Sequence, residues 1–285
     1  MLARVWFITG TSSGLGRALT EHALACGDIV VATLRKPEAL ADLSSRYGSE
    51  ALLVLRLDVT KMDELQAAFG RARETFGRLD VVVSNAGYCV LSEVEGTPLD
   101  VARSLFEVNF WGAVNTTREA VKFFREVNNP PGGRLVHISS MTGVNPSPSA
   151  SYYSASKHAG EGLMEAMSGE LNPAWNIKVT IITLGAFETR VMKESLVRVP
   201  QHPAYAYEGS FTSMARQWTE TVTLPGDITK AARAIHQISG DDDVPLRVAL
   251  GEDAIEAVLT KSARLKEEVE RSKHYSSDLK ADTSL

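Results

Sequence analysis

The sequence predicts an α/β fold, namely a doubly wound parallel sheet of seven strands with helices on both faces. Short apolar, β-branched runs alternate along the chain with helical patterns, which is typical of a parallel sheet with crossover helices. The first six runs are nearly continuous in apolar character, as strands buried on both faces are. A chain of 285 residues with 44% hydrophobic residues is long enough for one large domain of this kind.

The expected strands and helices alternate along the whole chain. The strands are expected at residues 5–9, 29–34, 52–57, 79–84, 134–139, 178–183 and 246–250. Helices are expected at 16–27, 61–77, 99–127, 151–171 and 227–239. A final helix follows the last strand, and we expect its apolar stripe to pack on the core; this stripe consists of Ile255, Val258, Leu259, Leu265 and Val269.

One domain is predicted over residues 1–272, followed by a polar, mobile tail over residues 273–285. An irregular insertion at 190–225 interrupts the alternation after the sixth strand.

Composition excludes several classes of protein. The net charge of -5 argues against a nucleic-acid-binding protein that relies on a basic surface. No apolar run is long enough to span a membrane, and the start of the chain lacks the layout of a signal peptide. Cys26 and Cys89 form no CxxC pair, and the six histidines show no ligand-like spacing. We therefore expect a cytoplasmic protein without disulfides or a metal centre.

A glycine-rich turn, TGTSSGLG, follows the first expected strand and opens a helix. Glycine allows a tight turn and a close backbone approach, and a helix N-terminus attracts an anion, so this turn predicts a dinucleotide pyrophosphate site in a Rossmann-type fold. The residues expected to contact the cofactor here are Gly10, Ser12, Ser13, Gly14, Leu15 and Gly16.

The end of the second strand predicts which dinucleotide is bound. NAD enzymes usually place a carboxylate here for the ribose 2′-hydroxyl, and that carboxylate would repel a 2′-phosphate. Leu34 occupies this place, and Arg35, which follows it, is suited to grip a phosphate. The prediction is NADP(H); the alternative is that Arg35 is an ordinary exposed loop residue.

Two neighbouring tyrosines precede a lysine in the stretch YYSASK. On a helix, residues four apart share a face, so Tyr153 lies on the same face as Lys157 whereas Tyr152 points away from it. With these residues, the sequence resembles the short-chain dehydrogenase/reductase family over roughly residues 4–190, and more loosely to about 250. The other motifs that carry the resemblance are the glycine turn, Asp58-Val59, Asn85-Ala86-Gly87, VNFWG with Asn109, and HISSMTG with Ser140.

The resemblance implies a catalytic tetrad and further cofactor contacts. The tetrad is Asn109, Ser140, Tyr153 and Lys157. The further cofactor contacts are Asp58 and Val59 at the adenine, Asn85, Ala86 and Gly87 after the fourth strand, Gly185, Phe187 and Thr189 after the sixth strand, and Tyr153 with Lys157 at the nicotinamide ribose. The family usually has Pro-Gly where this chain has Leu184-Gly185, which puts the geometry of that loop in doubt.

The implied reaction is hydride transfer between a nicotinamide and a carbonyl carbon, with Tyr153 as acid and base. A tyrosine pKa of about 10 suits a base poorly at neutral pH, so we expect the Lys157 ammonium to lower it. By resemblance, Ser140 bonds the substrate oxygen and Asn109 orders a water chain to Lys157. The prediction is a carbonyl reductase or alcohol dehydrogenase; the alternatives are a catalytically silent NADP(H) sensor, and an epimerase or dehydratase.

The insertion at 190–225 predicts the substrate. It follows the sixth strand, so we expect it to lie over the nicotinamide end of the site as a mobile lid for a largely apolar, cyclic or aromatic small molecule. The large groups expected there are Met192, Tyr205, Tyr207, Phe211, Met214 and Trp218, joined by Tyr88, Trp111 and Phe187. The alternative is that these rings pack on the body or on another subunit. By resemblance, we expect a homodimer or homotetramer built on the helices that contain Asn109 and Tyr153.

Overall fold

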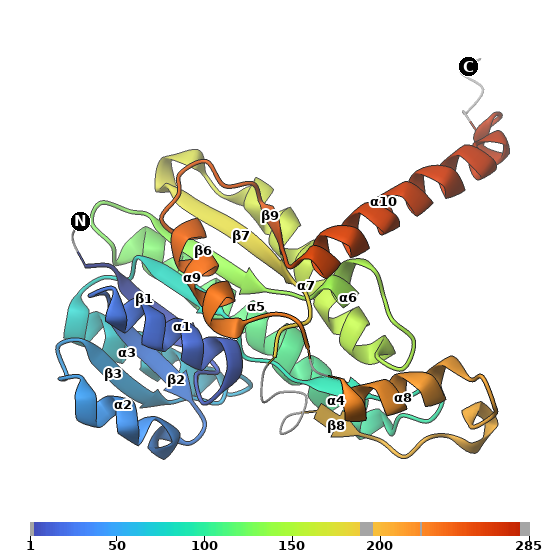
Figure 1. The fold of residues 1–285 in the computed structure, drawn as a ribbon. Coiled ribbons are helices and arrows are strands. Elements are labelled where there is room, and N and C mark those ends of the chain that lie inside the picture. Colours follow the sequence, from blue (N-terminus) through green and yellow to red (C-terminus); the bar gives the residue numbers. More distant parts are fainter. Residues whose placement is uncertain (1–2, 189–195, 223, 280–285) are drawn as a thin grey trace.

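A computed structural model describes residues 3–188, 196–222 and 224–279. It confirms the seven-stranded sheet, in which every neighbouring pair of strands is parallel (Figure 1). The strand order is β3-β2-β1-β4-β6-β7-β9. The strands are β1 Val5–Thr9, β2 Ile29–Leu34, β3 Leu52–Arg56, β4 Val81–Ser84, β6 Gly133–Ile138, β7 Ile177–Leu184 and β9 Arg247–Leu250. The order reverses between β1 and β4, and in such sheets ligands bind outside the carboxyl ends of the strands at that point.

Helices cover both faces of the sheet, as the alternating pattern predicts. One face carries α1 Gly14–Ala25, α2 Ala41–Arg46 and α9 Ile228–Ile238. The other carries α3 Met62–Phe76, α5 Gly112–Glu126 and α7 Ser151–Glu170. Short 3₁₀ turns lie at η1 Pro37–Leu40, η3 Pro173–Trp175 and η6 Lys273–Ser276. No helix in the described ranges has the length and apolar character that crossing a bilayer requires.

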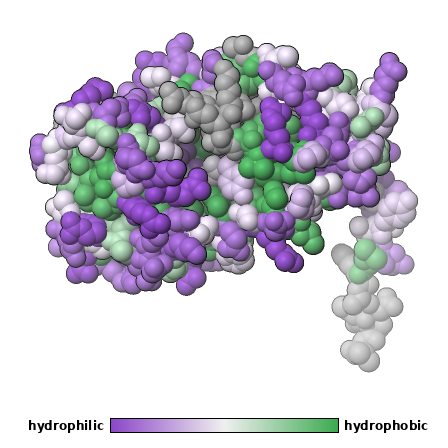
Figure 2. Space-filling model, turned by 90° about the horizontal axis from the view of Figure 1, so that it is seen from below, coloured by the Kyte–Doolittle hydropathy of each residue, from purple (hydrophilic) through white to green (hydrophobic). Residues whose placement is uncertain are grey.

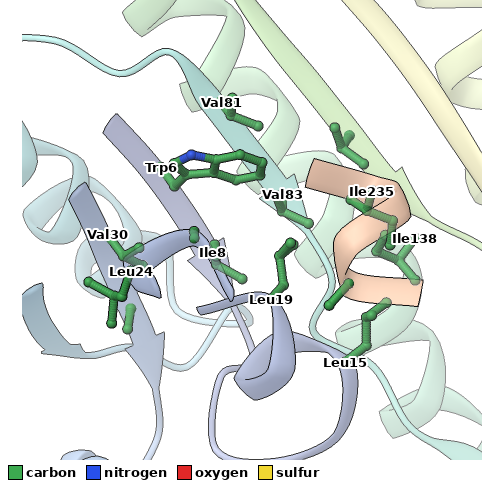
Figure 3. Close-up of a cluster of buried hydrophobic side chains, with 14 of the residues drawn as sticks. Trp6, Ile8, Leu15, Leu19, Leu24, Val30, Val81, Val83, Ile138 and Ile235 are labelled. Carbon is green, nitrogen blue, oxygen red and sulfur yellow. The ribbon is translucent and has the colours of Figure 1, made fainter. Parts of the chain in front are cut away.

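The first face buries a core of aliphatic side chains around one tryptophan (Figure 3). Trp6 and Ile8 point from β1 toward Leu19 of α1 and Ile235 of α9, and all four are fully buried. The Trp6 indole N–H is satisfied because it donates to Asp28 at 2.8 Å. This packing fixes α1, and with it the glycine turn, against the end of β1.

The single helix predicted at 99–127 is interrupted. It consists of α4 Leu99–Phe106, a π-helical turn Glu107–Trp111, and α5. A π turn adds one residue per turn and so shifts which side chains face inward. Asn109 lies in this turn and is buried. Gly112, just after it, packs on Val59 so closely that a Cβ would lie 2.6 Å from the valine Cγ2.

The insertion at 190–225 is more regular than the sequence predicts. It contains a strand, β8 Leu196–Arg198, and a helix, α8 Phe211–Thr221, with the short turn η5 Pro203–Tyr205 between them. β8 pairs in parallel with β5 Cys89–Leu91 in a separate two-stranded sheet. The Ser210 hydroxyl caps α8 by accepting from the Ser213 N–H.

The final helix, α10 Glu252–Ser272, does not pack on the core, so this prediction is wrong. Its first turns rest on β9 and on α6 Met141–Val144, and Ala254 is buried there. The rest stands clear of the body in both views (Figures 1 and 2). The apolar stripe is therefore largely in solvent: Ile255 is 48% exposed, Leu259 64%, Leu265 46% and Val269 60%.

Candidate active site

A cavity of about 1570 Å³ opens at the carboxyl ends of the strands, where the strand order reverses. It brings together most of the predicted site residues. Its walls include Gly10, Ser12, Ser13, Leu15, Arg35, Asp58, Val59, Asn85, Ala86, Gly87, Ser140, Tyr153, Lys157, Gly185 and Phe187. Gly14, Gly16 and Asn109 stand behind the walls, and Thr189 lies outside the described residues.

The glycine turn is built so that its backbone forms the cavity wall. Gly10 has φ +72° and Gly14 has φ +57°, values that L residues rarely adopt. A Cβ on Gly16 would lie 2.4 Å from the Gly10 carbonyl oxygen and 2.6 Å from Asn85 Nδ2. Asn85 Nδ2 donates to the Thr9 carbonyl at 2.7 Å, which ties the turn to the end of β4. The cradle therefore fits a pyrophosphate at the N-terminus of α1.

The opposite end of the same wall carries a cation and a carboxylate. Burial by itself would raise the pKa of Asp58, but hydrogen bonds from the Thr60 N–H at 3.0 Å and hydroxyl at 2.8 Å, together with the Arg35 charge, hold it below its usual range. Leu34, at the predicted acid position, is buried and ends β2. Arg35 thus stands on the cavity wall without a carboxylate beside it in the sequence.

Asn109 holds the backbone behind the cavity wall that carries Tyr153 and Lys157. Its Nδ2 donates to the Tyr88 carbonyl at 2.9 Å and to the Ser156 hydroxyl at 3.2 Å, and its Oδ1 accepts from the Tyr88 N–H at 3.0 Å. A Cβ on Gly87 would lie 3.1 Å from Asn109 Oδ1 and 3.5 Å from Lys157 Nζ. Asn109 therefore fixes the segment after β4 against α7.

Lys157 is a buried ammonium. Its Nζ donates to the Ile138 carbonyl at 2.8 Å, at the end of β6. Burial lowers the pKa of Lys157 to about 8, and the nearby Glu161 carboxylate opposes this shift. Glu161 is itself buried; its Oε1 accepts from the Ser139 hydroxyl at 2.5 Å and its Oε2 pairs with Arg247 at 3.1 Å.

Sequence reasoning missed Glu161, although one signal was present. Glu161 lies four residues after Lys157, as Lys157 lies four after Tyr153, so the three share one face of α7. A carboxylate one helical turn after the lysine, on the same face, indicates a counter-charge for it.

Tyr153 lies on the cavity wall, whereas Tyr152 does not line it, as the helical-face argument predicts. The expected fall in the Tyr153 pKa is wrong in direction. Burial raises this pKa, the Cys89 thiol adds to the rise, and the Ser140 hydroxyl opposes it. Lys157 Nζ lies 5.9 Å from the centre of the Tyr153 ring and donates its bond to Ile138 instead. The phenol is therefore held in its neutral form.

The Leu184-Gly185 departure is compensated by contacts from α10 and β9. Asp253 Oδ2 accepts from the Ala186 N–H at 2.6 Å, and the Gly185 N–H donates to the Leu250 carbonyl at 2.9 Å. A Cβ on Gly185 would lie 2.0 Å from Asp253 Oδ1, so a side chain here would displace the Asp253 carboxylate. The loop that leads to Phe187 is thus held without proline.

The insertion supplies part of the apolar lining of the cavity. Of the predicted large groups, the cavity lining includes Tyr88, Phe187, Phe211, Met214 and Trp218. Apolar residues also gather on the underside of the molecule, on the half that carries α8 (Figure 2). Three predictions fail: the Tyr205 hydroxyl donates to Glu95 at 3.1 Å, while Tyr207 and Trp111 are exposed and do not line the cavity. Met192 lies outside the described residues.

A buried ion pair anchors α8. Glu93, which is 2% exposed in its side chain, pairs with Arg216 of α8 at 3.1 Å, and Arg216 Nη1 donates to the Val199 carbonyl at 2.7 Å. Separating a buried ion pair leaves an uncompensated charge in the interior, which is costly. The pair therefore holds α8, and with it the apolar side chains of α8 that line the cavity, in place.

A second polar cluster lies at the amino ends of the strands, away from the cavity. His22, Cys26 and His236 each bring a nitrogen or sulfur atom within 4.8 Å of the others, which the sequence did not predict because α9 is distant in the chain. His236 stacks on Trp6 and its Nε2 lies 2.8 Å from Asp28 Oδ2. The Trp6 ring and the Asp28 carboxylate therefore give His236 a structural role in the packing at the end of α9.

Comparisons with known proteins agree with this geometry. An uncharacterized oxidoreductase, C162.03, from Schizosaccharomyces pombe is 36% identical over 96% of this chain and 91% of the relative. A solved short-chain dehydrogenase from Streptomyces avermitilis is 34% identical, with a TM-score of 0.89 over 99% of this chain and 100% of its own. The 11-beta-hydroxysteroid dehydrogenase A of Arachis hypogaea is 34% identical over 67% of this chain and 54% of its own length.

The sequence model of the family described as short chain dehydrogenase matches residues 4–198. That match spans the glycine turn, the Asn85 segment, Asn109, Ser140, Tyr153 and Lys157. The chain is an oxidoreductase that belongs to the short-chain dehydrogenase family.

Proposed function

We propose that the protein is an NADP(H)-dependent carbonyl reductase or alcohol dehydrogenase for a largely apolar small molecule. The observation that carries this proposal is the arrangement of Ser140, Tyr153 and Lys157 on one wall of a cavity whose other end is the glycine cradle. The dinucleotide would be held by the cradle, Arg35, Asp58 and Lys157, and when bound it supplies the hydride chemistry.

The chain's own groups handle the proton. Ser140 donates to the substrate oxygen and stabilises the charge that develops there. Tyr153, neutral because its pKa is raised, gives its proton to that oxygen as the carbonyl carbon receives hydride, and the product is an alcohol. The Lys157 ammonium, 5.9 Å from the centre of the Tyr153 ring, makes no hydrogen bond to it and contributes only positive charge near the phenolate that forms.

The apolar wall supports a bulky substrate. Met214 and Trp218 line the cavity from the insertion, and Phe187 lines it from the loop just before. We propose that the insertion, residues 190–225, acts as a lid. Similarity to a relative named for a hydroxysteroid supports a cyclic apolar compound. We also propose a cytoplasmic location, which two free cysteines support, and a homo-oligomer.

The first prediction concerns Tyr153. Replacing Tyr153 by Phe removes the proton donor and should lower kcat for carbonyl reduction by about 10²–10⁴-fold, while the Kd for NADPH stays nearly unchanged. The matched control, Tyr152→Phe, should keep most activity. NADPH absorbance with a mixed panel of ketones and aldehydes measures turnover. Tight NADPH binding without oxidation by any carbonyl would favour a sensor, and a product of unchanged oxidation state would favour an epimerase or dehydratase.

The second prediction concerns Arg35. A charge-assisted contact to a 2′-phosphate should give NADPH an advantage over NADH of about ten- to a hundred-fold in kcat/KM. Arg35→Ala should erase much of this preference, whereas Arg56→Ala, at the exposed end of β3, should leave it unchanged. Equal kcat/KM for both cofactors in the native enzyme would contradict the assignment.

The third prediction concerns pH. Lys157, with a pKa of about 8, loses its charge above that pH, so kcat/KM for reduction should be flat near neutrality and fall as the pH rises through about 8. Since Glu161 raises the Lys157 pKa, Glu161→Gln should move the fall to lower pH. Glu165→Gln is the control, because Glu165 also pairs with Arg247 but is exposed. Identical pH profiles for the native enzyme and Glu161→Gln would refute this role.

The fourth prediction concerns the apolar wall. In a matched panel of ketones and aldehydes, kcat/KM should be highest for bulky apolar compounds and lowest for small polar ones such as glyceraldehyde. Trp218→Ala should reduce the preference for the bulky compounds by about tenfold, since burying one large side chain contributes about 1.5–3 kcal/mol. The control is Tyr207→Ala in the same insertion, where the side chain is exposed. A preference for small polar substrates would sink the apolar-pocket proposal.

A further inference from the structure

In the described part of the chain, one group of side chains has the donor atoms of a transition-metal site. His22 and Cys26 lie four residues apart at the end of α1, so they share one side of that helix, and His236 comes from the last turn of α9. A nitrogen or sulfur atom of each lies within 4.8 Å of the others. None of the three lines the cavity, so the cluster is independent of the proposed reaction.

The separation between His22 and Cys26 matches one edge of a tetrahedral zinc site. Zinc lies about 2.0–2.1 Å from a histidine nitrogen and about 2.3 Å from a cysteine sulfur, so tetrahedral angles place the two donor atoms about 3.5–3.6 Å apart. Cys26 Sγ lies 3.6 Å from His22 Nε2. The His22 and His236 rings meet edge to face, with their centres 5.0 Å apart. Because Cys26 is exposed and His22 is only partly buried, both side chains have room to adjust around an ion.

Packing already fixes the orientation of the His236 ring. The ring stacks on Trp6 with 9° between the planes, and its Nε2 lies 2.8 Å from Asp28 Oδ2. We assign the proton to Nε2, which donates it to Asp28, so that Nδ1 keeps the lone pair that a metal needs. Arg4 Nη2 also lies 2.8 Å from Nε2, but it has acceptors in Asp28 Oδ2 and the His236 carbonyl, each at 3.4 Å. A carboxylate bonded to the other nitrogen is typical of histidines that bind zinc.

We propose that His22, Cys26 and His236 bind a divalent transition-metal ion such as Zn²⁺, with water in the fourth position. Sulfur and imidazole ligands suit Zn²⁺, whereas Mg²⁺ and Ca²⁺ prefer oxygen ligands. The Cys26 thiol gives its proton to solvent as the metal–sulfur bond forms. Because Cys26 is exposed, the ion can enter from solvent, and a water molecule can complete its coordination.

The charges around the cluster are compatible with a bound cation. His22 and His236 lie in the last turns of α1 and α9, where the helix dipoles favour positive charge. Burial, His236 and the nearby Arg233 charge lower the pKa of His22, which keeps this imidazole unprotonated at neutral pH. The Arg233 charge opposes a cation, and the Cys26 thiolate that forms on binding offsets it.

A bound ion would clamp two helices that are distant in the chain. α1 begins at the glycine turn and α9 follows the insertion, and the two helices contact each other on one face of the sheet (Figure 1). A ligand that binds the native chain but not the unfolded chain stabilises the native state by mass action. The unfolded chain keeps only the His22–Cys26 pair close together, so the ion should favour the native arrangement of α1 and α9.

Titration of the full chain, without a polyhistidine tag, with Zn²⁺ and Co²⁺ tests the site. One equivalent of Zn²⁺ should bind with a Kd in the micromolar range or below and should raise Tm. Co²⁺ should give the thiolate-to-cobalt charge-transfer band of a tetrahedral site with a sulfur ligand. Mg²⁺ is the control and should neither bind nor raise Tm, because nitrogen and sulfur ligands do not suit it.

Replacing the ligands assigns the site. His22→Gln and His236→Gln should each weaken Zn²⁺ binding by about a hundredfold, since losing even a contact behind a ligand costs about 10–100-fold. Cys26→Ser should also abolish the cobalt charge-transfer band, although Cys89 is still present. The control His274→Gln, at an exposed histidine outside the cluster, should keep the native affinity and the band. An unchanged far-UV circular dichroism spectrum without metal would show that each variant is folded.

A crystal soaked in Zn²⁺ locates the ion without any variant. Anomalous scattering at the zinc edge should give one peak between His22, Cys26 and His236. A native chain that binds Zn²⁺ no more tightly than Mg²⁺ would overturn the proposal. So would a peak elsewhere, or Zn²⁺ binding that Cys26→Ser and His22→Gln leave unchanged. Binding that depends on this pair but not on His236 would contradict the clamp between α1 and α9.

Discussion

The cavity wall that carries Ser140, Tyr153 and Lys157 depends on keeping a buried ammonium charged. Taking Lys157 out of water disfavours its charged form, and a lysine that loses its proton offers nothing to a phenolate. Two features of the fold compensate: the Ile138 carbonyl at the end of β6, and the buried Glu161 carboxylate one turn further along α7. The Ile138 carbonyl and the Glu161 carboxylate lie near Lys157 Nζ because β6 and α7 contact each other. The charge state of Lys157 is therefore a consequence of strand order and helix placement.

The end of the cavity formed by the glycine turn depends on exclusion of side chains. Gly16, Gly10 and Asn85 meet so closely that a single methyl group would separate β1, α1 and β4. The buried core beneath them, with Leu19 against Ile8 and Ile235, keeps α1 in place and leaves its N-terminus aimed into the cavity (Figure 3). Rigidity at one end of the cavity contrasts with the insertion at the other, where one ion pair between Glu93 and Arg216 fixes α8.

Local patterns predicted the sheet and most of the residues that line the cavity, because both follow from short-range rules. Apolar runs predicted all seven strands, and the four-residue spacing separated Tyr153 from Tyr152. The predictions that were wrong or missing concern which side chains from distant parts of the chain contact a given residue. The raised pKa of Tyr153, the neighbourhood of Cys89 and the support of Gly185 by Asp253 all come from elements distant in the chain. The π turn at Asn109 was missed for another reason, since an extra residue in a turn leaves the apolar periodicity nearly unchanged.

The apolar stripe of α10 shows the same limit more generally. The spacing of apolar residues predicts that one face of a helix is buried, but it does not predict which element buries that face. At 255–269 the pattern fits burial in the chain's own core as well as it fits a seam with another helix, and the structure rejects the first. Burial in the core requires contacts with elements distant in the chain, and the spacing of apolar residues carries no information about those contacts.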